Sequence, residues 1–240
     1  MAGLGLAWLV LLGPIGAYDD TFFWAHMTQH VVLMMLIAPL LILGSPVLLL
    51  LRHAPPGTRH RRLVPVLRSR LAHALCSPWG TWLVFAGVVV GTHFTPFYNI
   101  ALRHQWVHRY VEHPLYLGAA LLYYFPLLDR LAPRRLPPAS RILSLFLMMV
   151  PEAMTGFFIY SQGYVLYPHY LAVSRPFGPG PLADQQLGGA LMWAGSMVID
   201  ALWIALATRD WLQAEERKGR RVDVEIAREA AAARTGLEVS

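Results

Sequence analysis

The feature that most constrains this chain is a stretch of apolar residues without charge. The twenty residues that follow His30 contain no Asp, Glu, Lys or Arg. About 20 apolar residues in a helix match the hydrocarbon thickness of a lipid bilayer. Of the 240 residues, 56% are hydrophobic and only 14% are charged, whereas about a quarter of a soluble domain is charged. The sequence therefore predicts an all-α fold, a polytopic integral membrane bundle of helices.

Six apolar segments are interpreted as transmembrane helices. They cover residues 2–17, 22–51, 79–98, 114–129, 141–160 and 186–208. The first is short and rich in glycine, and Pro39 and the Gly-Ser-Pro at 44–46 are expected to bend the second near its far end. We therefore expect a transmembrane helical domain over residues 1–210. A charged, solvated cytoplasmic helix is expected to follow over residues 211–240.

Basic residues divide the connecting segments into two groups. The net charge is +6, and Lys218 is the only lysine. Most arginines of the connections lie in segments 52–78 and 130–141, namely Arg52, Arg59, Arg61, Arg62, Arg68, Arg70, Arg130, Arg134, Arg135 and Arg141. The connections at 18–23, 99–113 and 161–185 carry few. Because arginine-rich loops stay on the cytoplasmic side, we expect both termini in the cytoplasm. The positive net charge thus indicates the orientation in the membrane, and we expect no nucleic-acid partner.

Seven of the ten histidines fall on or near the outer side in this topology. They are His26, His30, His93, His104, His108, His113 and His169. His26 and His30 are four residues apart at the start of a span, so a helix places them on one face. If segment 99–113 is helical, His104 and His108 also share a face, and Glu112 lies one turn beyond His108.

These histidines are candidate metal ligands. Imidazole suits copper, zinc, iron and nickel, and methionine thioethers select cuprous ions; Met27, Met154 and Met192 lie on or near the same side. Cys76 is the only cysteine, so a His and Met set favours copper over structural zinc, which usually has thiolate ligands. The alternative for any single residue is a membrane-interface position for His or a core position for Met.

Two acids, Glu152 and Asp200, lie inside predicted spans. A carboxyl group at membrane depth is costly and normally faces the interior of the bundle. It can belong to a proton or cation path, or it can form a hydrogen bond between helices. We favour the structural interpretation for Asp200, and both remain open for Glu152.

The last span begins with a polar segment, residues 181–193. Asp184 suits the N-terminus of a helix, and Gly188 and Gly189 allow close helix packing. Neither effect explains why Gln185 and Gln186 enter a span together.

Taken together, these segments resemble the CtaG-type cytochrome c oxidase assembly proteins of bacteria. The resemblance rests on HMTQH with APLLILGSP, THFTPFYNIAL, HRYVEH and LADQQLGGALMW in that order, over about residues 22–208. It implies a multi-pass plasma membrane protein, usually with seven spans in relatives, that acts in the maturation of copper-containing terminal oxidases. The residues that the resemblance marks are His26, His30, His93, His108, Glu112, His113, Asp184, Gln185, Gln186, Met192 and Trp193.

We therefore expect an assembly factor without catalytic turnover that handles or inserts copper at the outer face. His26, His30, His93, His108, His113 and Met192 are the predicted ligands. Glu112, Asp184, Gln185 and Gln186 are predicted to support them, with Glu112 or Asp184 orienting an imidazole. The expected partners are oxidase subunits and other copper chaperones. The alternatives are a haem-binding redox protein with two axial histidines, such as His30 and His93, and a chaperone that binds no metal.

Overall fold

The computed structural model describes residues 1–129 and 131–237, and side chains up to residue 228. Arg130 and residues 238–240, which belong to the predicted basic segment and tail, lie outside the described residues. Every regular element in the described chain is helical. The all-α fold predicted from the sequence is confirmed.

The helices follow one another through short connections. The first half contains α1 (Ala2–Leu12), α2 (Phe23–Val32), η1 (Leu33–Ile37), α3 (Ala38–Leu43), α4 (Pro46–His53), α5 (Pro56–Thr58), η2 (Arg59–Leu63), α6 (Val64–Leu67), α7 (Arg70–Leu75), α8 (Pro78–His93) and α9 (Pro96–Arg103). The second half contains α10 (Gln105–Val107), η3 (His108–Glu112), α11 (His113–Leu128), α12 (Pro138–Ser161), α13 (His169–Ala172), α14 (Pro181–Ala190), η4 (Leu191–Gly195) and α15 (Ser196–Leu237). The η segments are single π-helical turns within longer helices.

Three helices are long and apolar enough to cross a membrane within the described chain: Phe23–Leu43, Pro138–Ser161 and Pro181–Arg228. A fourth crossing is possible if α8 and α9, which meet at a bend of 68°, form one broken span. This is fewer than the six spans expected. Two expected spans fall short because α1 has only 11 residues and α11 only 16, and about 20 are needed to cross the hydrocarbon core.

Local sequence signals set the helix boundaries. The expected bend at 44–46 ends the helix after Leu43, where Ser45 adopts a left-handed backbone with φ of 51° and Pro46 begins α4. Proline also opens α8, where the Ser77 side chain accepts a hydrogen bond from the Gly80 amide. Proline is favoured at the first helical position because its missing N–H has no partner there anyway.

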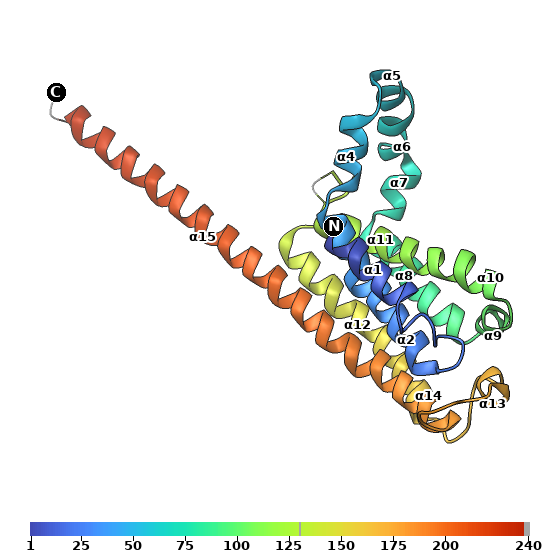
Figure 1. Cartoon of the computed structure of the whole chain (residues 1–240). Helices are drawn as coiled ribbons and strands as arrows, with labels where there is room; N and C mark the ends of the chain where they lie inside the picture. The colour runs from blue at the N-terminus through green and yellow to red at the C-terminus, as the bar shows by residue number, and fades with distance from the viewer. Residues whose placement is uncertain (130, 238–240) are drawn as a thin grey trace.

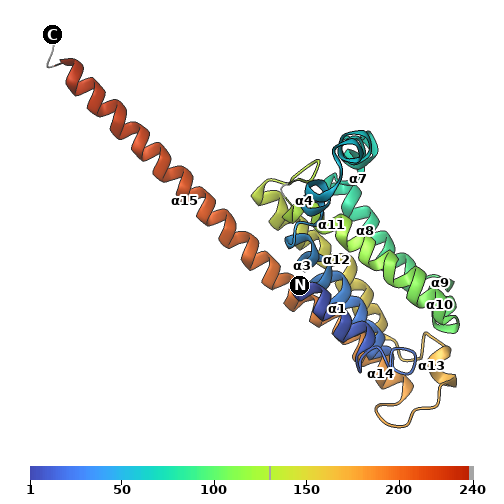
Figure 2. The ribbon, with the colours of Figure 1, turned by 45° about the horizontal axis from the view of Figure 1, so that its top comes forward.

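The core of the bundle lies between α2–α3, α8, α11, α12 and the helix that runs from α14 into α15, which pack against one another (Figures 1 and 2). The close packing predicted from glycines is present where α12 crosses α14. A Cβ atom on Gly156 would lie 2.5 Å from the Trp193 amide nitrogen, and one on Gly189 would lie 2.6 Å from the Tyr160 amide nitrogen. Only glycine permits this approach of two backbones.

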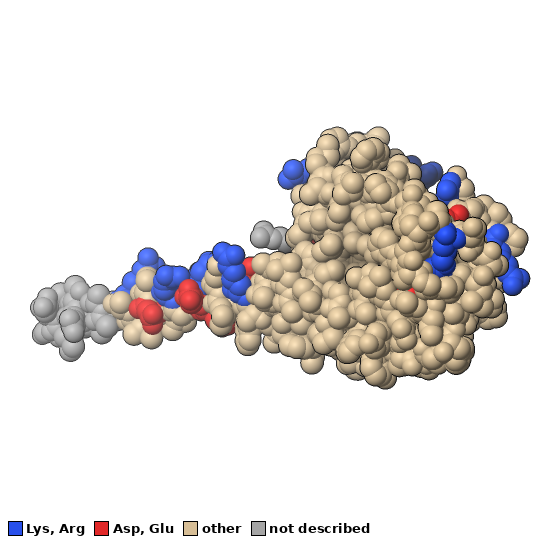
Figure 3. All heavy atoms as spheres, turned by 60° about the horizontal axis from the view of Figure 1, so that its bottom comes forward, with Lys and Arg blue, Asp and Glu red and all other residues tan. Residues whose placement is uncertain are grey.

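The two ends of the bundle differ in charge. The α4–α7 hairpin carries exposed arginines, including Arg52, Arg61, Arg62 and Arg68, and projects from one end, while α9, α13 and the start of α14 lie at the other (Figure 1). The C-terminal part of α15 extends away from the bundle as the predicted helical tail. In the face shown in Figure 3, charged side chains lie along the described part of this tail and at the rim, and most of the body between them is uncharged.

Candidate metal centre

The candidate site lies where α2 meets η3, and helical periodicity presents its residues. His26 and His30 lie one turn apart on α2, with ring centroids 4.3 Å apart. His108 and Glu112 are four residues apart, and the His108 Nδ1 and Glu112 Oε2 atoms lie 2.5 Å apart. Both pairings were predicted from spacing. The fold brings these two pairs together, since the His26 and His108 ring centroids are 4.6 Å apart.

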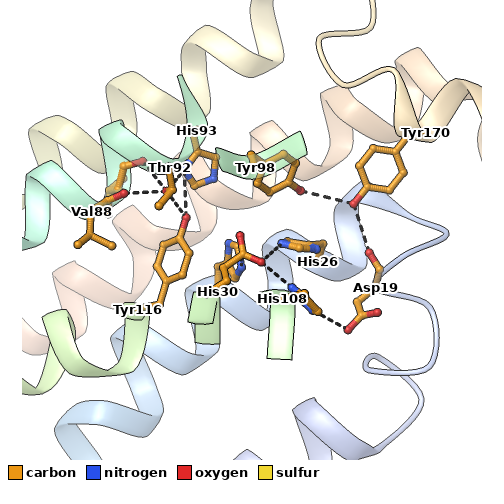
Figure 4. A network of polar contacts seen from close by, with 12 residues as sticks. Asp19, His26, His30, Val88, Thr92, His93, Tyr98, His108, Tyr116 and Tyr170 are labelled. Atoms are coloured by element: carbon orange, nitrogen blue, oxygen red, sulfur yellow. Dashed lines mark hydrogen bonds and ion pairs between the residues drawn. The ribbon is translucent and has the colours of Figure 1, made fainter. Parts of the chain in front are cut away.

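Glu112 is the centre of the cluster. Its side chain is fully buried, and three imidazoles surround its carboxylate. The His26 Nε2 atom lies 3.6 Å from Oε2, and the His30 Nε2 atom lies 3.7 Å from Oε1. Figure 4 shows His108 of η3 facing His26 and His30 of α2. A carboxylate so far from water requires positive charge or hydrogen-bond donors around it.

Asp19 orients His108 from the opposite side. The His108 Nε2 atom lies 3.0 Å from Asp19 Oδ2, while Nδ1 faces Glu112. Tyr170 holds the Asp19 backbone in turn, because its hydroxyl donates to the Asp19 carbonyl over 3.2 Å. Burial by itself would raise the pKa of the Asp19 carboxyl, but the hydrogen bond and charge of His108 bring that pKa below its usual range. A carboxylate on the second nitrogen of an imidazole is the arrangement found behind many metal-ligating histidines.

The cluster contains several buried polar atoms that have the chemistry of metal ligands. His26, His108 and Glu112 each offer one ligand atom, and these three atoms lie within 4.8 Å of one another. Both ring nitrogens of His26, both of His30 and Oε1 of Glu112 are buried without a hydrogen-bond partner. Because unpartnered buried polar atoms are costly and uncommon, the set is suited to a bound cation that would satisfy them.

His93 borders the cluster, whereas His113 packs directly against His108, with ring centroids 4.2 Å apart. The His93 and His113 ring centroids lie 6.1 Å and 6.4 Å from that of His30. His93 Nδ1 donates to the Val89 carbonyl over 2.7 Å, which leaves Nε2 with a free lone pair and no partner. The predicted convergence of His26, His30 and His93 is therefore partial, since His93 approaches His30 alone.

Other predicted site residues lie elsewhere. Met192 lines a small cavity with His30, His93 and Glu152. Asp200 is buried in α15 with one unpartnered oxygen. The remaining histidines of the outer set, His104 and His169, do not join the cluster. His104 is exposed, and His169 Nε2 donates to the Asp20 carbonyl.

The polar residues of 181–193 hold the helices that carry the site. The Asp184 carboxylate accepts hydrogen bonds from the Phe23 and Trp24 amides at the start of α2, and Arg175 pairs with it at 2.8 Å. Asp184 therefore caps α2, the helix of His26 and His30, and contacts no imidazole.

Gln185 fastens the loop before α14. Its side chain accepts from the Leu166 amide over 2.6 Å and donates to the Tyr164 carbonyl over 3.0 Å. Gln186 is partly buried, and Trp193 packs against Phe157 on α12. Neither glutamine side chain contacts a histidine among the described hydrogen bonds.

Sequence reasoning missed Asp19 and Tyr116. Tyr116 stacks on His30 with ring centroids 4.1 Å apart and hydrogen-bonds Thr92 beside His93. In the sequence, Asp19 belongs only to the connection 18–23, which is poor in arginine. A signal existed for Asp19, since an acid beside a histidine-rich outer surface is a natural partner for imidazole. The separation of 89 positions between Asp19 and His108 gave no local pattern.

Comparison with known proteins places the chain among its relatives. An uncharacterized protein of Mycobacterium bovis is 31% identical over 231 residues, which cover 91% of this chain and 34% of that protein. An uncharacterized protein of Mycobacterium leprae is 28% identical over 217 residues, 87% of this chain and 33% of that protein. This chain thus spans about a third of the length of the curated relatives it matches. No solved structure gives a significant match.

The family comparison covers most of the bundle. A protein-family model described as cytochrome c oxidase caa3 assembly factor matches residues 1–214. These residues include every helix that contributes to the cluster around Glu112. The resemblance seen in the sequence is confirmed, and the chain belongs to the cytochrome c oxidase caa3 assembly factor family.

Proposed function

We propose that this protein holds copper at the outer end of its bundle as cargo for a copper-containing cytochrome c oxidase. The observation that carries the proposal is the buried Glu112 carboxylate with three imidazoles around it and unpartnered nitrogens on two of them. The family supplies the process, oxidase assembly, and the cluster supplies a place for the ion. The partners in this role are oxidase subunits and other copper chaperones.

The donor set fits a cupric ion. Nitrogen and oxygen donors from His26, His108 and Glu112 are the ligand types that Cu(II) accepts. His30 lies close enough to contribute as a fourth donor, and Asp19 fixes the ring of His108. A holding site needs no reaction on the ion, so we propose a role without catalytic turnover, in which binding and release follow contact with the oxidase.

The charge distribution supports an orientation in the bacterial plasma membrane. The arginines of the α4–α7 hairpin lie at the end opposite α9 and α13 (Figure 1), and arginine-rich segments remain cytoplasmic. On this orientation the termini are cytoplasmic and the histidine cluster lies near the outer face, where it can deliver copper to an oxidase.

The two alternatives from the sequence gain less support. A haem held by His30 and His93 would have to fit between rings whose centroids are 6.1 Å apart, beside a cavity of about 20 Å³. That volume holds roughly one water molecule, so a porphyrin would require the helices to separate. A chaperone that binds no metal would leave the unpartnered nitrogens of His26 and His30 buried without purpose.

The test is to supply variants to cells that lack the protein. Glu112→Gln keeps the size of the side chain and removes the charged ligand at the centre of the cluster. We expect it to behave like the deletion, with oxidase activity falling more than the amount of oxidase apoprotein, and with partial rescue by added copper. The measurements are oxygen consumption, haem spectra and copper content of the oxidase at matched expression of each variant.

His104→Gln is the matched control, because His104 is exposed at the same end and lies outside the cluster. It should support oxidase assembly as the unaltered protein does. Normal oxidase activity and copper content in cells that carry Glu112→Gln would refute the copper role. Normal values in the deletion itself would refute the role in assembly.

A further inference from the structure

A second group of candidate ligands lies deeper in the bundle. A cavity of about 20 Å³ lies between α2, η1, α8, α11, α12 and η4, and this volume is enough for one water-sized occupant. Its lining residues are Met27, His30, Val31, Met34, Met35, Val89, His93, Tyr116, Glu152, Met192 and Ser196. Four of these residues are methionines, and all four are buried.

Unpartnered polar groups surround the same cavity. His30 and His93 are each 4% exposed, and Glu152 is 4% exposed. Both nitrogens of His30, Nε2 of His93 and Oε2 of Glu152 have no hydrogen-bond partner. The Val89 carbonyl accepts from His93 Nδ1, so the lone pair of His93 lies on the other nitrogen. Three side chains with unpartnered polar atoms around one cavity are not explained by the packing of an apolar core.

The chemistry of this lining differs from that of the cluster around Glu112. Thioethers are soft ligands that select cuprous ions and bind hard or strongly hydrated divalent ions poorly. Methionine is ordinary core filler, but filler does not account for four methionines placed around two imidazoles with free lone pairs. Glu152 adds an oxygen donor to the lining beside these soft ligands.

We propose that this cavity is a second metal site, which binds one soft monovalent cation of the cuprous type through methionine sulfurs, His30 and His93. This second site rests on the proposed function in one respect only, namely that the outer cluster supplies the copper ion. His30 connects the two sites, because its Nε2 atom lies 3.7 Å from Glu112 Oε1 and its ring also lines the cavity. An ion released from the outer cluster thus has an adjacent, softer set of ligands.

Three of the four π-helical turns in the described part of the chain contribute residues to these two sites. η1 carries Met34 and Met35, η3 carries His108 and Glu112, and η4 carries Met192. A π turn inserts a residue into the helical register and is frequent at functional sites. The turns therefore set which side chains face the outer cluster and which face the cavity.

The experiment is an Ag(I) titration of the full-length protein in detergent, with a competing chelator. Ag(I) is a soft monovalent ion that needs no reductant, and Cys76→Ser serves as the background because it removes the only thiol. The test variant is Met34→Leu/Met35→Leu/Met192→Leu, which keeps side-chain volume. The control is Met154→Leu/Met197→Leu, since Met154 is 62% exposed and Met197 is 39% exposed.

We expect the background protein and the control to bind one Ag(I) with sulfur neighbours in X-ray absorption. The test variant should bind it at least about 10–100-fold more weakly, the loss already typical of altered support around a ligand. Its Cu(II) binding should stay unchanged. Equal Ag(I) affinity in test and control variants would overturn the second site.

Two further measurements test the proposal independently of the triple variant. If the triple variant does not fold, absorption spectra of Ag(I) in the Cys76→Ser protein decide alone, and an ion without sulfur neighbours overturns the proposal. Glu112→Gln should keep Ag(I) binding while it loses Cu(II). Normal oxidase assembly in cells with Glu112→Gln would refute the proposed copper role and leave the Ag(I) result standing.

Discussion

Glu112 and Asp19 have different tasks at the scale of single residues. Glu112 lies within 4 Å of nitrogens from three histidines, whereas Asp19 contacts only the far nitrogen of His108. A residue that supports a ligand tunes the affinity, and a ligand determines whether the ion binds at all.

Asp19→Asn should therefore lower Cu(II) affinity by about 10–100-fold, the range typical of a lost support residue. It keeps the side-chain shape and removes the charge behind His108. The measurement is a Cu(II) titration against a competing chelator. Asp20→Asn is the neighbouring control, since the Asp20 side chain contacts Thr21 and Gln105 and no histidine. Equal affinities in both variants would show that Asp19 does not orient a ligand.

Residue spacing predicted the contacts within one helix and missed those between helices. His26 with His30, and His108 with Glu112, follow from a period of 3.6 residues. Asp19 with His108 and Asp184 with the start of α2 join residues 89 and 160 or more apart. Asp184 suits its own helix N-terminus in sequence, yet its carboxylate caps another helix. Only the packing of the bundle decides such partners.

Close helix contact is the main feature at the scale of elements. α12 and α14 touch at Gly156 and Gly189, where an added Cβ would meet backbone atoms that cannot move aside. This contact holds α14, which in turn caps α2 through Asp184. The position of α2, and of the histidines that it carries, therefore depends on this contact between α12 and α14.

Gly189→Ala should destabilise the protein, by about 1–3 kcal/mol or more, as overpacking of a tight interior does. Gly195→Ala is the matched control, because a Cβ there meets nothing within 4 Å. The thermal unfolding midpoint in detergent is the measurement. A midpoint in the Gly189→Ala protein as high as that in the control would mean that the two helices are not held this closely.

The positions of the helices were easier to predict from the sequence than the number of helices that cross the membrane. The predicted segment 141–160 corresponds to α12 (Pro138–Ser161), because an unbroken apolar run of this length has one simple structure. The segment 22–51 was predicted too long, since the left-handed Ser45 ends the helix after Leu43. Hydropathy alone counted residues 2–17 as a span, but the helix stops at Leu12.

The whole molecule has a histidine end and an arginine end. Orientation follows from this asymmetry if arginine-rich segments stay inside. Single cysteines at residues 60, 105 and 225, in a Cys76→Ser background, report it through labelling of intact cells with an impermeant thiol reagent. Residue 105 should be labelled from outside, and residues 60 and 225 only after lysis. Labelling of residue 105 only after lysis would place the histidine cluster in the cytoplasm.

The most direct test of the account is Cu(II) binding by the purified protein. We predict one tightly bound Cu(II) per chain, with nitrogen couplings in the electron paramagnetic resonance spectrum from His26 and His108. Glu112→Gln should lose this ion, while His104→Gln keeps it, because His104 is exposed and lies outside the cluster. A chain that binds no Cu(II), or a Glu112→Gln protein that binds it as tightly as the unaltered protein, would contradict the central claim.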